Sequence, residues 1–151
     1  MIKKTLFALA LILQATITYS QDIIVIDDEI KKGESSVPFA VIEDVPTFPG
    51  CEEIEKGKKL SCFNTKVSEH INTTFKYPSK ARRKNIEGRV LVMFVINKEG
   101  DITNIETKGG DPILQTEALR IVRLLPKMKP GMQKGKPVNV KYTLPITFKL
   151  E

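Results

Sequence analysis

The sequence is poor in the residues on which most catalytic and metal chemistry depends. It has one histidine, His70, two cysteines and no tryptophan among 151 residues. Ser68, Thr73 and Thr74 lie near His70, but they do not form a set of nucleophile, base and orienting acid. A Gly-x-Ser-x-Gly motif and a phosphate-binding loop are also missing. We therefore expect a protein that is not an enzyme, with no cofactor, no metal site and no catalytic residue, and with His70 as an ordinary boundary residue.

No apolar run reaches the roughly 20 residues that a transmembrane helix needs. The run Thr5–Leu13 stops at Gln14, follows Lys3 and Lys4, and precedes the small residue Ser20. These features predict a signal peptide over residues 1–20 that is cleaved, and hence an exported protein. The alternative is an uncleaved segment that anchors the chain in a membrane.

Charge is distributed unevenly, although the formal net charge is only +6. Residues 21–56 contain ten acids and three bases, whereas residues 57–151 contain 19 bases and eight acids. We expect residues 21–45 to be a flexible or extended acidic lead-in and residues 46–151 to form one domain. A basic patch is expected from Arg82, Arg83, Lys84, Lys127 and Lys129. For an exported protein this patch indicates a solvated face or binding to cell-wall or other envelope polyanions, and not to nucleic acid.

Cys51 and Cys62 are the two cysteines of the chain. In an exported protein, two cysteines most simply form one disulfide. A redox or metal pair is the alternative, but the spacing is not Cys-x-x-Cys and no cluster of His or acids surrounds the pair.

The most regular pattern is the alternation of apolar and polar residues over 138–150, which is typical of a strand with one face on a core. Pro145 interrupts the polar positions, and proline within a strand favours a sheet edge because it has no N–H to donate. A long edge strand can accept a peptide as an additional strand, or a second copy of the chain as a homodimer. The predicted peptide-binding residues are Val138, Asn139, Val140, Lys141, Tyr142, Thr143 and Leu144.

Two helices, a hairpin and a third helix precede this strand. Asp111 and Pro112 predict the start of the main helix and Pro126 its end, and the basic connection 127–137 is expected to be irregular and to steer acidic segments toward the edge. The expected order is helix 66–75, helix 78–85, strand 88–97, strand 102–107, helix 112–125 and strand 138–150. This order predicts an α+β fold, with a three-stranded antiparallel sheet packed on helices.

Several of these stretches together resemble the C-terminal domain of TonB. The motifs are Tyr77-Pro78-x-x-Ala81, Ile86-Glu87-Gly88-Arg89-Val90, Leu125-Pro126-Lys127-Met128-Lys129-Pro130-Gly131, Gly135-Lys136-Pro137-Val138 and Tyr142-x-Leu144-Pro145-Ile146-x-Phe148. They follow one another in register over residues 66–151, and the lead-in Pro46-x-Phe48-Pro49-Gly50 is similar to the form found in Bacteroidetes. Met128 stands where the family usually has an aromatic residue.

The resemblance implies a ββαβ periplasmic module that takes part in TonB-dependent transport. It implies that the last strand pairs with a short segment of an outer-membrane receptor, and that the partner is therefore a TonB-dependent receptor. Inner-membrane motor proteins are implied only if residues 1–20 anchor the chain. A Lys-Pro or Glu-Pro repeat, which would form a long spacer, is not present.

Overall fold

The computed structural model describes residues 35–151. The predicted signal peptide and most of the predicted acidic lead-in lie outside the described residues. Five strands form a sheet in the order β1-β5-β2-β3, with β4 paired to β5 beyond this series. The α+β class with an antiparallel sheet on helices is as predicted, but the sheet has two short strands more than the three expected.

The elements follow the sequence signals with small shifts of their ends. The strands are β1 (Ser36–Pro38), β2 (Gly88–Ile96), β3 (Ile102–Lys108), β4 (Gly131–Gln133) and β5 (Lys136–Phe148). The α-helices are α1 (Lys59–Thr74), α2 (Ser79–Arg83) and α3 (Pro112–Arg123). Short 3₁₀ turns occupy Phe39–Val41 and Lys56–Lys58.

α1 begins seven residues before the predicted start. Phe63 precedes Val67 by one turn and is fully buried, so it extends the apolar stripe that indicated the helix. α3 begins as predicted, because the Asp111 carboxylate accepts a hydrogen bond of 2.8 Å from the backbone N–H of Ile113 and Pro112 occupies the first turn.

The prediction that residues 127–137 are irregular is wrong at their C-terminal end. Gly131–Gln133 forms β4, which pairs antiparallel with Lys136–Val138 through a tight turn at Lys134 and Gly135. Both turn residues have positive φ, 49° and 72°, which is the geometry of a two-residue hairpin turn.

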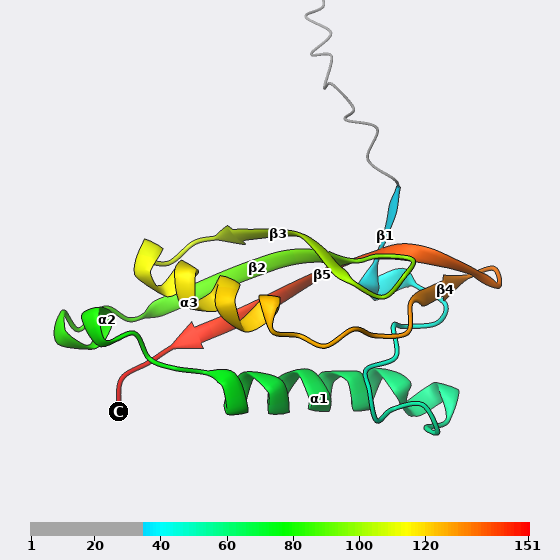
Figure 1. The fold of residues 1–151 in the computed structure, drawn as a ribbon, viewed down its shortest axis with the longest axis horizontal. Coiled ribbons are helices and arrows are strands. Elements are labelled where there is room, and N and C mark those ends of the chain that lie inside the picture. Colours follow the sequence, from blue (N-terminus) through cyan, green and yellow to red (C-terminus); the bar gives the residue numbers. More distant parts are fainter. Residues whose placement is uncertain (1–34) are drawn as a thin grey trace, which may run out of the picture. The chain divides into compact units, whose positions relative to one another are not determined.

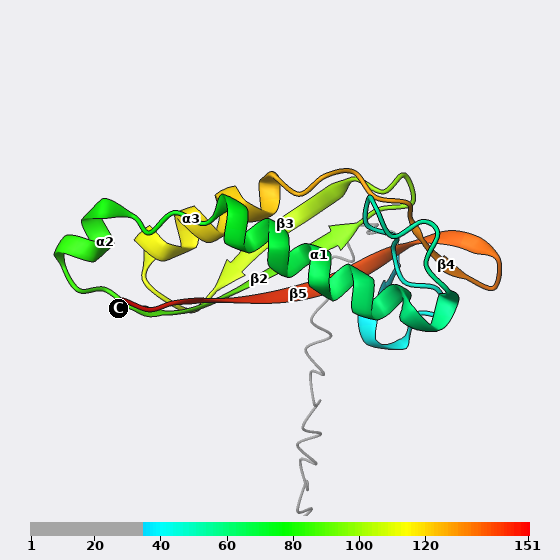
Figure 2. The same cartoon turned by 90° about the horizontal axis from the view of Figure 1, so that it is seen from below.

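One face of the sheet carries the core. The even-numbered residues of β2 from Val90 to Ile96 are buried, as are Leu144, Ile146 and Phe148 of β5. α3 packs on β2 and β3, and α1 lies on the same side of the sheet (Figures 1 and 2). The two helices are direct neighbours, because the Nε2 of His70 on α1 lies 2.9 Å from the carbonyl oxygen of Ile121 on α3. His70 therefore has a structural hydrogen bond, with Nε2 donating.

Candidate functional site

β5 is a sheet edge over only part of its length. On one side it pairs with β2 from Val140 to Phe148. β4 pairs with Lys136–Val138 just before this stretch, and on the other side of β5, β1 runs parallel to Asn139–Lys141. The prediction of a free edge along the whole strand is therefore wrong for the first half. Among residues 35–151, no strand pairs with the outer side of Tyr142–Phe148, which we call the open flank.

The structure divides the seven predicted peptide-binding residues between these two regions. Val138 is already paired with β4, and Asn139, Val140 and Lys141 are paired on the outer side by β1. Tyr142, Thr143 and Leu144 begin the open flank, which continues beyond the prediction to Phe148. The short strand β1 was not visible in the sequence as a partner of β5, because its pairing joins residues more than 100 positions apart.

The backbone of the open flank alternates in the direction of its polar groups. The carbonyl oxygen of Val95 accepts a hydrogen bond of 3.4 Å from Thr103 Oγ1 on β3, so odd-numbered residues of β2 face β3. Even-numbered residues of β2 then face β5, and they pair with even-numbered residues of β5. The odd-numbered residues Thr143, Pro145 and Thr147 therefore direct their backbone groups outward. Pro145 lacks an N–H and sits where no partner in β2 needs one.

α1 follows β5 along the open flank. The ring of Phe63 lies 5.3 Å from that of Tyr142, and the ring of Phe75 lies 5.2 Å from that of Phe148. Twelve residues of helix advance about 18 Å and six residues of strand about 20 Å, so the two elements run in the same direction over the same distance.

The helical layer is wider than the strands beneath it. Neighbouring helices lie roughly 8–10 Å apart and neighbouring strands about 4.8 Å apart. Since α3 packs on β2 and β3, its neighbour α1 has its axis roughly 1–3 Å outside β5. α1 thus extends over the position that one further strand would occupy.

A groove lies at this position. It has a volume of about 280 Å³ and is lined by Ile71, Asn72 and Phe75 of α1 and by Pro145, Ile146 and Thr147 of the open flank. We call it the α1 groove. It can take the core-facing side chain of an added strand. Of its helical residues, Ile71 and Phe75 belong to the apolar stripe that predicted the helix, and the structure shows both to be partly exposed.

An ion pair between the buried Glu117 and the partly exposed Arg120 holds the end of α1 against α3. The Glu117 carboxylate is 8% exposed and accepts hydrogen bonds from the backbone N–H of Lys76, at 2.9 Å, and from Arg120 Nη2, at 2.6 Å. Arg120 Nη2 also donates to the carbonyl oxygen of Thr74. Burial by itself raises the pKa of Glu117, but the hydrogen bonds from Arg120 and Lys76 and the nearby positive charges outweigh it and hold the pKa below its usual value.

A disulfide joins Cys51 to Cys62, as predicted. Cys51 is 1% exposed and follows Phe48, which is also buried. The bond ties the lead-in of the domain to the first turns of α1, next to the aromatic contact between Phe48 and Phe63.

The predicted basic patch is not one surface. Arg82, Arg83 and Lys84 lie at α2, just before β2 begins. Lys127 pairs with Asp101 at 2.9 Å, and the backbone of Lys129 pairs with Thr47, both beyond the other end of β2. The length of β2 separates the two groups by roughly 25 Å. Among the described residues, no group of three or more His, Cys, Asp or Glu is placed to hold a metal.

Comparison with known proteins agrees, over most of this domain, with the family resemblance seen in the sequence. Residues 73–150, more than half of the chain, match the family model described as Gram-negative bacterial TonB protein C-terminal. "Protein TonB" from two strains of Helicobacter pylori is 30% and 31% identical over 91 residues, which are 59% of this chain. These residues span only 30% and 31% of those proteins.

Two NMR solution structures of the Helicobacter pylori TonB C-terminal domain are also similar. One is 28% identical, covers 66% of this chain and 87% of that domain, and has a TM-score of 0.48. The other is 31% identical, covers 58% of this chain and 92% of that domain, and has a TM-score of 0.43. Over residues 35–151, no helix is long and apolar enough to cross a bilayer. The family is an interaction module without enzymatic activity, and on the match over residues 73–150 this chain belongs to the TonB C-terminal domain family.

Proposed function

We propose that this domain binds an extended segment of an outer-membrane transporter by adding it as a strand to the open flank of β5, in TonB-dependent transport in the periplasm. The observation that supports this proposal is the unfilled strand position between the open flank and α1. Family membership supports the class of partner.

The open flank supplies main-chain pairing. Thr143 and Thr147 direct both an N–H and a carbonyl outward, and Pro145 directs a carbonyl only. Each hydrogen bond formed with a peptide contributes about 0.5–1.5 kcal/mol net, so a few pairs give a weak and reversible complex unless side chains add to it. The α1 groove adds an apolar contact on the core side.

The binding test uses a substitution that removes one outward N–H. Thr147→Pro deletes the N–H on the open flank and leaves the pairing with β2 intact, because Thr147 faces away from β2. The matched control Thr147→Val keeps the N–H and the β-branched shape. The side chain at position 147 is exposed, so both variants should fold.

We expect N-terminal peptides of candidate receptors to shift the amide signals of residues 142–148 of the wild-type protein. Thr147→Val should bind with nearly unchanged affinity, and Thr147→Pro should lose about tenfold or more, since the loss of one pair also disturbs its neighbours. Equal affinity of the two variants, or shifts confined to other parts of the domain, would rule out pairing at the open flank.

A further inference from the structure

A second groove continues from the open flank at the end of β5. It has a volume of about 870 Å³ and is lined by Phe75, Lys76, Tyr77, Arg82, Asn85, Lys149, Leu150 and Glu151. We call it the tail groove. Phe75 lines both the α1 groove and the tail groove, so the two grooves adjoin at the end of α1.

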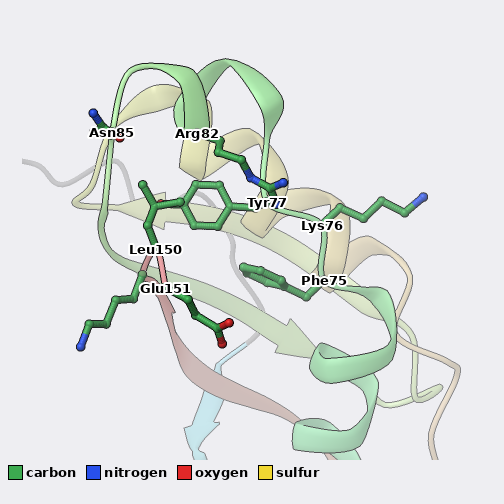
Figure 3. Close-up of a pocket in the computed structure, with 8 residues that line it drawn as sticks. Phe75, Lys76, Tyr77, Arg82, Asn85, Leu150 and Glu151 are labelled. Carbon is green, nitrogen blue, oxygen red and sulfur yellow. The ribbon is translucent and has the colours of Figure 1, made fainter.

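The floor of the tail groove is apolar. Figure 3 shows the ring of Tyr77 beside the side chain of Leu150, with the ring of Phe75 farther along the groove. Tyr77 is held in place because its hydroxyl donates a hydrogen bond of 2.7 Å to the carbonyl oxygen of Ile86. Its ring also packs edge-on to Phe148, at 6.1 Å between centroids. The groove therefore offers a fixed aromatic surface to an apolar side chain.

The rim of the tail groove is mostly cationic. Arg82, Lys76 and Lys149 line it together with one carboxylate side chain, that of Glu151, and a second carboxylate, Glu87, accepts a hydrogen bond from the backbone N–H of Leu150. The guanidinium carbon of Arg82 lies 5.8 Å from the centroid of the Tyr77 ring, which keeps the guanidinium over the floor (Figure 3). Within residues 35–151, neither Arg82 nor Lys149 forms an ion pair. Their charges are thus available to an acidic ligand.

A strand on the open flank leads directly into this groove. Lys149 and Leu150 follow Thr147 by two and three residues, a distance of about 7–10 Å along the strand. A segment paired with Thr143 and Thr147 therefore brings its next one to three residues over Phe75, Tyr77 and Arg82.

We propose that the tail groove recognises the end of the captured segment, and that it selects an acidic residue next to an apolar one. The apolar side chain packs on Phe75, Tyr77 and Leu150, while Arg82 and Lys149 at the rim attract the carboxylate. This inference rests on the proposed function, and it adds a side-chain preference that backbone pairing cannot supply. It also makes the direction of the bound segment measurable, because only one end of the peptide reaches the groove.

The test uses capped host peptides of alternating Thr and Val. Leu-Asp is placed at the carboxyl end of one peptide and Asp-Leu at the amino end of another, and each has a matched peptide with Asn in place of Asp. We expect one of the two Asp peptides to bind the wild-type protein about fivefold more tightly than its Asn match at low salt. The end that gives this preference defines the direction of pairing.

The protein variants are Arg82→Gln combined with Lys149→Gln, and the charge-preserving control Arg82→Lys combined with Lys149→Arg. The Gln variant should lose the preference for Asp, bind the Asn peptides as the wild type does, and melt at the same temperature. The control should keep most of the preference. A polyglutamate peptide of equal length tests for a general polyanion surface.

The outcomes separate this inference from the proposed function. Binding that Thr147→Pro abolishes but that shows no preference for Asp at either end overturns the tail-groove proposal alone. The tail-groove proposal is also overturned if the Gln variant keeps the preference for Asp. The same holds if the Gln variant loses as much affinity for polyglutamate as for the Asp peptide. If no peptide binds, or if binding ignores Thr147→Pro, the proposed function fails as well.

Discussion

Removal of the Cys51–Cys62 disulfide should lower stability without weakening peptide binding. The cysteines are 11 residues apart, and a loop of this size removes about 3 kcal/mol of unfolded-chain entropy at 25 °C. For a domain of about 117 residues, the unfolding entropy near the midpoint is roughly 0.25 kcal/mol per kelvin. We therefore expect the reduced protein to melt about 12 °C lower than the oxidised protein.

Peptide binding should be preserved because the disulfide lies at the N-terminal end of α1, whereas the α1 groove lies at its C-terminal end. Cys62 is in the first turn of α1, whereas Ile71, Asn72 and Phe75 line the α1 groove more than two turns later. That later part is held by the hydrogen bond from Arg120 to the Thr74 carbonyl and by the contact between Phe75 and Phe148.

The assay is thermal unfolding by circular dichroism with and without reductant, together with a peptide titration at about 15 °C. The double variant Cys51→Ala/Cys62→Ala distinguishes the loss of the disulfide from other effects of the reductant. It should melt close to the reduced wild type. A reduced protein that melts within about 3 °C of the oxidised one would refute the loop-entropy argument. A large loss of affinity at a temperature where the protein is folded would refute the claim that the two ends of α1 act separately.

Three further predictions concern stability and assembly. The pKa of Glu117 is lower in the folded protein than its unfolded value of about 4.3. The ionised Glu117 therefore stabilises the fold at pH values above about 4.3, and this stabilisation is lost as the pH falls through the folded pKa. Glu117→Gln should thus cost about 1–3 kcal/mol in urea unfolding at pH 7, and progressively less as the pH falls below the unfolded pKa. Gly100→Ala should cost more than about 3 kcal/mol in the same assay, since its Cβ would lie 1.7 Å from the Met128 carbonyl oxygen. Gly135→Ala, with φ of 72° and no atom within 4 Å, should cost only about 1–2 kcal/mol. If two copies pair through the open flank, sedimentation at high concentration will show a dimer that Thr147→Pro weakens and Thr147→Val does not.

Local patterns in the sequence determined most elements of this protein. The alternation over 138–150 predicted β5, and the Asp111-Pro112 pair predicted the start of α3, because both signals act through nearest neighbours along the chain. The same holds for the turn at Gly100, where the backbone N–H of Asn97 donates to the Asp101 carbonyl oxygen at 2.9 Å. The tight turn at Lys134 and Gly135 was also a local signal, but the many basic and proline residues around it concealed it.

Only the tertiary structure decided which part of β5 is free to bind. Whether a strand has a neighbour depends on residues far away in the chain, and here Ser36–Pro38 covers Asn139–Lys141 from a distance of about 100 positions. The same reason separates Arg82 from Lys127, which composition alone had placed in one basic patch. The position of α1 beyond the open flank likewise follows from its packing against α3, and no periodicity along α1 records that contact.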